Sequence, residues 1–268
     1  MPHKTAFSFV PLDHRRSLSK PRRSGLTMVS DYQLGLKALE DLLDVAGDYI
    51  DIFKIATGTS RLFARDHLTA KISMLHAAGV RVLLGGQFQE YLIHTVGLDM
   101  LPRHLDEARE VGFDMIEISE NLVDLGPGGM VTMLQAVTEA GLDPVGEIGT
   151  KDLKTDADSL VGDVRAVLEA GSVFAMIEGQ ELMRDNGEPN VELIEYLKRE
   201  LDVDRCMFEL PTPRVGSTTV DIYACKKALV KAFGRDVNLG NVTPDVVIET
   251  ETTRLGLGSS GPLSLTKS

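Results

Sequence analysis

The feature that most constrains the fold is a regular alternation of short apolar segments with longer amphipathic segments. Several apolar segments carry large apolar residues at both odd and even positions, as at Ile50, Ile52, Phe53 and Ile55. Strands that are apolar on both faces are typical of a parallel sheet covered by helices. The predicted strands cover residues 26–30, 49–56, 81–85, 115–119, 144–148, 173–178, 206–210 and 237–240.

The segments between these strands have the apolar spacing of helices that bury one face. Predicted helices include residues 60–78, 130–140, 160–170, 191–201 and 219–233. A glycine follows several of them, at Gly79, Gly141, Gly171 and Gly234. Helices often end at such a glycine because it tolerates left-handed backbone. A strand followed by a helix is therefore the repeating unit of this chain.

The number of these units predicts the fold class. The chain has 268 residues, which is close to the roughly 250 residues typical of one (β/α)₈ barrel. Eight consecutive units without a break in composition favour a closed barrel over an open doubly wound sheet, which usually has fewer strands. We therefore expect an α/β protein with a single-domain (β/α)₈ TIM barrel at 24–258, an N-terminal arm or lid at 1–23 and a C-terminal tail at 259–268.

Composition limits the partners of the protein. A formal net charge of -12 argues against binding to nucleic acid or to an anionic membrane surface, since both are negative. A small anionic substrate needs only a locally positive pocket. Cys206 and Cys225 form no CxxC motif, and no apolar run has the length of a signal peptide or membrane span. We expect a cytoplasmic protein with reduced thiols and, because barrels commonly associate, a homo-oligomer.

Acidic residues stand at the carboxyl ends of several predicted strands, where barrels build their active sites. Glu117, Glu147, Glu178 and Glu209 end strands four to seven. Carboxylates that are buried together raise one another's pKa unless positive charge lies among them. Oxygen ligands without a histidine or cysteine cluster favour Mg²⁺ over Zn²⁺. Each of these acids has an alternative role as a helix cap or as the partner of a lysine.

Two lysines stand out by their positions. Lys54 lies inside an apolar strand, where a lysine is unfavourable without a partner or a task, so it either forms a buried ion pair or takes part in chemistry. Lys151 follows the fifth predicted strand. Its role there is that of a general acid, of an anion ligand, or of an ordinary loop residue. Glycines after strands, such as Gly86 and Gly258, allow backbone amides to approach a phosphate, although tight turns need glycine for steric reasons alone.

Strand-end motifs occur in a specific order from about residue 20 to residue 257. They are Lys20-Pro21-Arg22, Gly25-Leu26-Thr27-Met28-Val29 with Asp31, Gly47-Asp48-Tyr49-Ile50-Asp51 with Lys54, Gly58-Thr59-Ser60, Gly85-Gly86, Gly112-Phe113-Asp114 with Ile116-Glu117-Ile118-Ser119, Glu147-Ile148-Gly149 with Lys151-Asp152, Ile177-Glu178 with Glu181, and Val237-Asn238-Leu239-Gly240-Asn241. In this order they resemble the phosphosulfolactate synthase family, which also includes plant heat-stress proteins.

The resemblance implies a carbon–sulfur lyase or synthase on a (β/α)₈ barrel that adds sulfite to phosphoenolpyruvate with Mg²⁺. It also implies that Glu117, Glu147 and Glu178 hold the metal. Lys151 is then the acid that protonates C2 after attack on the methylene carbon, and Lys54 and Glu147 are further catalytic residues. The predicted substrate-binding residues are Arg22, Thr59, Gly86, Ser119, Arg214, Asn238, Asn241 and Gly258.

The chain departs from the family pattern after its sixth strand. The family has arginine, glutamate, serine and glycine where this chain has Gln180-Glu181-Leu182-Met183, so a cationic anion ligand is absent and Arg214 is expected to replace its charge. Two alternatives to the synthase stay open. One is a Schiff-base aldolase that uses Lys54 or Lys151. The other is a non-catalytic stress or assembly protein on the same barrel.

Overall fold

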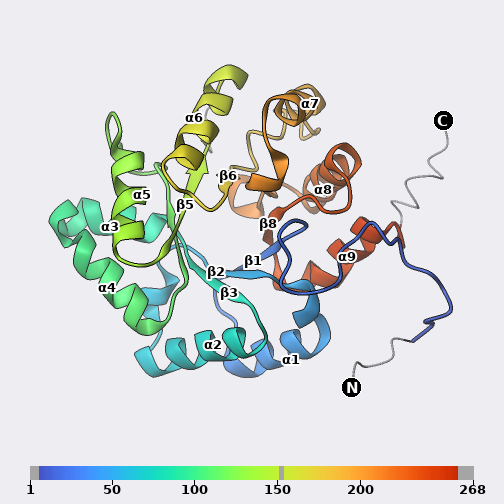
Figure 1. Cartoon of the computed structure of the whole chain (residues 1–268), viewed down its shortest axis with the longest axis horizontal. Helices are drawn as coiled ribbons and strands as arrows, with labels where there is room; N and C mark the ends of the chain where they lie inside the picture. The colour runs from blue at the N-terminus through green and yellow to red at the C-terminus, as the bar shows by residue number, and fades with distance from the viewer. Residues whose placement is uncertain (1–5, 151–153, 259–268) are drawn as a thin grey trace.

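The computed structural model describes residues 6–150 and 154–258, which form a closed parallel barrel surrounded by helices (Figure 1). The strands are β1 (Thr27–Asp31), β2 (Ile52–Ile55), β3 (Arg81–Leu84), β4 (Met115–Ile118), β5 (Asp143–Ile148), β6 (Ala175–Ile177), β7 (Cys206–Glu209) and β8 (Leu239–Val242). They pair in chain order, and β8 pairs with β1 to close the barrel. The predicted (β/α)₈ TIM barrel is therefore confirmed.

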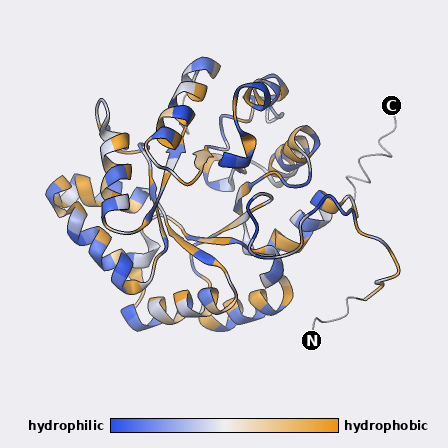
Figure 2. Ribbon diagram, viewed as in Figure 1, coloured by the Kyte–Doolittle hydropathy of each residue, from blue (hydrophilic) through white to orange (hydrophobic). Residues whose placement is uncertain are grey.

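The outer layer consists of helices that cross from one strand to the next. They are α1 (Leu36–Ala46), α2 (Arg65–Ala77), α3 (Gln87–Val96), α4 (Leu101–Val111), α5 (Gly129–Glu139), α6 (Ala157–Glu169), α7 (Val191–Glu200), α8 (Thr219–Phe233) and α9 (Val247–Leu255). Hydrophobic and hydrophilic residues alternate along them (Figure 2), as expected for helices that bury one face. None of the helices within the described residues is long and apolar enough to cross a membrane.

Side chains alternate between the inside and the outside of the barrel along each strand, because strand side chains have a period of two. One buried cluster fills the barrel interior and consists of Met28, Ile52, Leu83, Met115, Val145, Phe174, Met176 and Met207. Residues of the opposite parity, such as Phe53 and Ile116, belong to the main core between strands and helices. Burying each of these large side chains stabilises the fold by about 1.5–3 kcal/mol.

Local interactions move two of the predicted boundaries. The predicted helix at 60–78 divides into a 3₁₀ segment, Thr59–Leu62, and α2, because Phe63 and Ala64 between them are extended. The last strand starts at residue 239 instead of 237. There Asn238 donates from its side-chain amide to the carbonyl oxygens of Asp204 and Cys206, at 3.0 and 2.9 Å, before the strand begins. The four predicted helix-ending glycines all have positive φ.

The N-terminal arm, as far as the structure describes it, crosses the end of the barrel where the strands begin. Arg16 is buried and donates to Oε1 of Glu251 in α9 at 2.7 Å. Lys20 donates to the carbonyl oxygen of Gly47, which follows α1, at 2.9 Å. Active sites of such barrels lie at the opposite end. The described part of the arm therefore contacts the end of the barrel opposite such a site.

Candidate active site

The charged residues in the mouth of the barrel share one position in the strand pattern. Each lies two residues after an apolar side chain of the barrel interior, so both point inward. The pairs are Ile52 and Lys54, Met115 and Glu117, Val145 and Glu147, Met176 and Glu178, and Met207 and Glu209. All five charged residues are buried. The strand period therefore places a charged layer on top of an apolar layer at the carboxyl ends of the strands.

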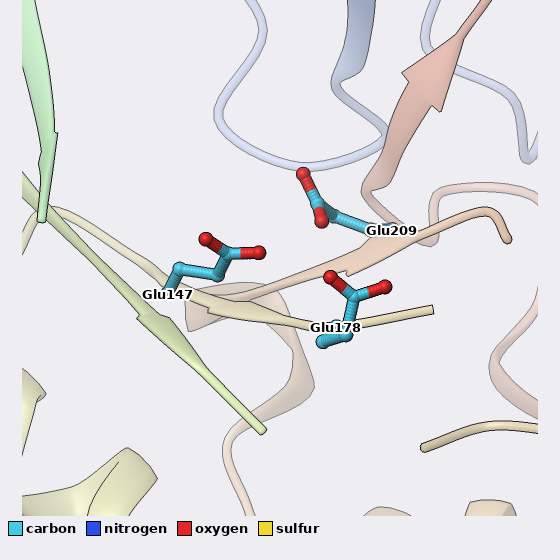
Figure 3. Close-up of side chains that lie close together, drawn as sticks. All are labelled: Glu147, Glu178 and Glu209. Atoms are coloured by element: carbon cyan, nitrogen blue, oxygen red, sulfur yellow. The ribbon is translucent and has the colours of Figure 1, made fainter. Parts of the chain in front are cut away.

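Three of the glutamates form a compact group. Glu147, Glu178 and Glu209 come from neighbouring strands, and each offers one carboxylate oxygen within 4.8 Å of the others (Figure 3). Carboxylate oxygens are ligands that Mg²⁺ accepts, so the group fits a divalent cation. Of the predicted metal ligands, Glu147 and Glu178 belong to this group. Glu117 does not, and Glu209 joins the other two.

Glu117 pairs instead with Lys54. Nζ of Lys54 lies 2.6 Å from Oε2 of Glu117 and 3.1 Å from Oε1 of Glu209. Burial alone would lower the pKa of Lys54, but the negative charges of Glu117, Glu209 and Glu147 more than offset it and raise that pKa well above its ordinary value. Lys54 is therefore a cation at neutral pH, and it balances part of the negative charge of the mouth.

Glu117 also binds its proton more tightly than an exposed glutamate. Burial raises the pKa of Glu117, Lys54 opposes the rise, and the charges of Glu147 and Glu209 add to it, as does a hydrogen bond with Glu147. The net pKa is well above its usual range. Two buried carboxylates this close share a proton because both cannot ionise at low cost. The Glu117–Glu147 pair thus retains a proton at a pH where exposed glutamates have lost theirs.

A pocket of about 250 Å³ contains all five charged side chains. The other residues that line it are Tyr32, Ala56, Thr57, Gly86, Gln87, Thr212, Arg214, Val215 and Asn241. The guanidinium carbon of Arg214 lies 3.3 Å from the centroid of the Tyr32 ring, which is a cation–π contact. Arg214 and Lys54 therefore bring positive charge to a pocket that holds four carboxylates.

Two residues of the pocket wall have left-handed backbone although neither is glycine. The φ angles of Thr57 and Asn241 are 52° and 53°. Oδ1 of Asn241 accepts a hydrogen bond from the hydroxyl of Ser30 at 2.9 Å. Such conformations cost about 1–3 kcal/mol each and persist where the surroundings enforce them, which is common in binding sites.

Gly86 and Ser119 lie against each other at the carboxyl ends of β3 and β4. A Cβ atom on Gly86 would collide with the hydroxyl of Ser119 and lie 3.1 Å from Cγ of Glu117. Ser119 is buried, and its hydroxyl donates to Glu90 at 2.5 Å. Gly86 lines the pocket, whereas Ser119 packs behind it. Glycine is required here because the side chains of Ser119 and Glu117 occupy the space that a Cβ atom would need.

Two of the predicted substrate-binding residues lie where the strands begin, away from the pocket. Nε of Arg22 donates to both carboxylate oxygens of Asp51, the residue just before β2, at 3.0 and 3.1 Å. Asn238 precedes β8, and its Oδ1 accepts from the backbone N–H of Leu26 at 2.9 Å. Both were predicted to bind substrate, but their contacts join the starts of strands and neither residue lines the pocket.

The remaining predicted residues differ in placement. Gly258 follows α9, whose Arg254 donates to a backbone carbonyl just before β1 at 3.1 Å, so Gly258 also lies far from the carboxyl-end pocket. Thr59 donates from its hydroxyl to the carbonyl of Ala56 at 2.8 Å and stabilises the turn after β2. Lys151 lies outside the described residues.

Several residues that line the pocket were absent from the predicted site, among them Glu209, Thr57 and Tyr32. Glu209 has the same strand-end position as Glu178, so the sequence carried a signal for it. Tyr32 directly follows β1 and Thr57 follows Ala56 after β2, but no motif marks them. Their roles depend on which neighbours the closed barrel brings to them. Arg214, Gly86 and Asn241 were predicted and do line the pocket.

Known proteins match this chain along most of its length. The family profile described as (2R)-phospho-3-sulfolactate synthase (ComA) matches residues 15–260. Relatives from Methanothermobacter thermautotrophicus and Methanocaldococcus jannaschii, both named phosphosulfolactate synthase, are 30% identical over 89% and 94% of this chain and 91% and 96% of their own. The Arabidopsis thaliana protein HEAT-STRESS-ASSOCIATED 32 is 22% identical over 82% of each chain.

Solved structures share the fold at lower identity. The YdjI aldolase from Escherichia coli K12 superposes with a TM-score of 0.54 and 14% identity, over 84% of this chain and 77% of its own. Such a likeness supports the barrel alone, because barrels host many chemistries. The match to the family profile, in contrast, spans the barrel and its whole mouth. This chain therefore belongs to the phosphosulfolactate synthase family.

Proposed function

We propose that this protein adds sulfite to phosphoenolpyruvate, with Mg²⁺ as cofactor, to give phosphosulfolactate. The observation that carries the proposal is one pocket that joins three grouped carboxylates to the cations Lys54 and Arg214. Phosphoenolpyruvate carries a carboxylate and a phosphate close together, so its binding requires positive charge from a metal ion and from basic side chains. We further expect the protein to be cytoplasmic and to form a homo-oligomer. Size-exclusion chromatography of the purified protein tests the oligomeric state.

Glu147, Glu178 and Glu209 are the residues that would hold Mg²⁺. These three residues offer carboxylate oxygens as ligands. Oxygen ligands are hard, and they bind Mg²⁺ in preference to softer metal ions. When bound, the ion would stabilise negative charge on the substrate carboxylate.

Lys54 and Arg214 are suited to hold the anionic groups of the substrate. The Lys54 ammonium is fixed between Glu117 and Glu209. These two buried partners therefore set the direction of its third N–H donor. The Arg214 guanidinium is planar and matches two phosphate oxygens at once. Its stacking on Tyr32 limits its rotation. We assign Lys54 to the carboxylate of the substrate and Arg214 to the phosphate.

The reaction forms one bond and transfers one proton. The sulfur lone pair of sulfite attacks the methylene carbon, and the electron pair of the double bond moves toward the substrate carboxylate. A proton then adds to C2, and we assign Lys151 as its donor. On either side of Lys151 in the sequence, Glu181 accepts from the N–H of Thr150 at 2.9 Å and from the hydroxyl of Thr155 at 2.7 Å.

The pKa of Lys54 argues against a Schiff-base mechanism at that residue. An amine attacks a carbonyl only in its neutral form, whereas the surrounding glutamates raise the pKa of Lys54 and keep it protonated. A non-catalytic protein differs from both enzymes in that its pocket need not bind a substrate at all.

The test is incubation with phosphoenolpyruvate, sulfite and Mg²⁺, followed by mass spectrometry against an enzyme-free control. We expect phosphosulfolactate, its loss with a chelator and its recovery with added Mg²⁺. Lys151→Ala is expected to abolish turnover and keep the fold. Lys154→Ala, which changes an exposed lysine close to it in the sequence, is expected to keep both. Absence of product above the control would overturn sulfite addition.

Two further readouts separate the alternatives. A borohydride-trapped adduct with a carbonyl substrate would favour the aldolase. No change in melting temperature with phosphoenolpyruvate, sulfite or Mg²⁺ would favour a non-catalytic protein, since a ligand that binds the native state raises its stability.

A further inference from the structure

Asn121 contacts a carboxylate of the proposed metal site, although no sequence motif marks it. It lies in the loop between β4 and α5, and its Nδ2 donates to Oε2 of Glu147 at 3.0 Å. Asn121 is half-buried, whereas its neighbours Glu120 and Leu122 are exposed. A donor bound to one carboxylate oxygen fixes the orientation of the whole carboxylate. Together with the hydrogen bond to Glu117, the contact therefore sets where Glu147 directs its oxygens.

A single buried acid holds the loop around Asn121. Glu90 is 1% exposed and accepts from the hydroxyl of Ser119 at 2.5 Å and from the N–H groups of Leu122 and Val123 at 2.5 and 3.1 Å. These three donors lie on both sides of Asn121 in the chain. The Leu122 side chain is 69% exposed, so its own burial does not hold this residue in place. Charge-assisted hydrogen bonds to Glu90 hold it instead.

Glu90 is itself fixed, because it belongs to the first turn of α3. Its neighbour Gln89 is buried and donates from Nε2 to the backbone carbonyl of Glu117 in β4. The helix α3 precedes α4 in the same connection (Figure 1), and a barrel needs only one helix between two strands. The additional helix thus binds to β4 and to the loop that follows it.

We propose that Glu90 and Asn121 are positioning residues of the metal site. Glu90 fixes the loop after β4, and Asn121 on that loop orients the carboxylate of Glu147 toward Glu178 and Glu209. The inference rests on the divalent-cation site of the proposed function. Partners of this kind, which orient a ligand without touching the metal, typically change metal affinity by about 10–100-fold.

Binding of Mn²⁺ to the full chain without substrate provides the test, measured by electron paramagnetic resonance of the free ion. We expect Asn121→Ala to lower Mn²⁺ affinity by about 10–100-fold, and Leu122→Ala, the matched change on the same loop, to leave it unaltered. Glu90→Gln is expected to lower affinity as well, because an amide has one acceptor oxygen for three donors. Circular dichroism and urea unfolding without metal identify any variant that has lost its fold.

The outcomes separate this inference from the proposed function. Wild-type affinity in Asn121→Ala would overturn the inference and leave the metal site standing, whereas a wild-type protein that binds no Mn²⁺ would overturn both. With saturating Mg²⁺, Asn121→Ala is expected to recover turnover with an unchanged KM for phosphoenolpyruvate. A raised KM under these conditions would instead assign Asn121 to substrate binding and contradict the positioning role.

Discussion

Lys54 and Glu117 lie on strands that are separated by β3, yet Nζ of Lys54 is 2.6 Å from Oε2 of Glu117. Lys54 also lies 3.1 Å from Oε1 of Glu209, so it links Glu117 to the carboxylate group. Glu117 is engaged by the lysine, and the oxygens of Glu147, Glu178 and Glu209 gather beside it. Removing one partner of a buried ion pair costs about 3–5 kcal/mol because the other charge is left behind. The pair therefore contributes to both the fold and the site.

Metal affinity is expected to distinguish Glu209 from Glu117. Glu209→Gln removes a member of the carboxylate group and should weaken Mg²⁺ binding by more than about tenfold, since losing a ligand costs more than losing an outer partner. Glu117→Gln should weaken it less. Isothermal titration calorimetry provides the measurement, with the exposed neighbour Glu120→Gln as the control. A larger loss in Glu117→Gln would restore the ligand set predicted from the sequence.

Substrate affinity is expected to depend on Arg214. A hydrogen bond to a charged group contributes about 1.5–3 kcal/mol, so Arg214→Ala should raise the KM for phosphoenolpyruvate about 10–100-fold and leave stability nearly unchanged. Arg214→Lys should recover only part of the loss, because lysine lacks the bidentate fork. The matched control is Arg199→Ala, an arginine that lies 5.5 Å from the Tyr196 ring in α7. Equal KM values in the two alanine variants would remove Arg214 from the site.

The N-terminal arm is expected to matter for stability and not for substrate binding. Arg16→Ala leaves the buried carboxylate of Glu251 without its main partner and should lower the free energy of unfolding by about 3–5 kcal/mol. Arg15→Ala removes a solvent-screened pair with Asp13 and should leave the free energy of unfolding nearly unchanged. Urea unfolding measures both variants. If Arg16→Ala changed KM without loss of stability, the arm would act on the pocket after all.

We expect His104 to make the folded protein less stable as the pH falls. Burial lowers the pKa of this histidine from 6.5 to about 4, and its ring packs edge-on against Phe88. The unfolded chain therefore takes up a proton as the pH falls below 6.5, whereas the folded chain does so only near pH 4. Stability is lost over this window by up to about 3 kcal/mol. Urea unfolding between pH 7 and pH 4 should show a smaller loss in His104→Leu, and equal slopes would contradict the assignment.

The limits of sequence reasoning are clearest in the ligands of the mouth. The predictions of Glu147 and Glu178 rest on their strand-end positions, which are local properties that a pattern of period two reveals. Arg22 and Asn238 are also polar residues beside strands, yet they lie at the other end of the barrel. A strand pattern shows which side chains point inward, but the end at which a flanking residue lies depends on the path of the adjoining segment.

By itself the sequence determined the barrel and the charged layer in its mouth. Both follow from periodicities, since each strand alternates faces and each helix buries one side. Only the tertiary structure decided that Lys54 engages Glu117, that Glu209 joins the carboxylate group and that Asn121 reaches Glu147. These partners come from different strands and loops. Their distances depend on barrel closure and loop paths, which no local pattern in the chain encodes.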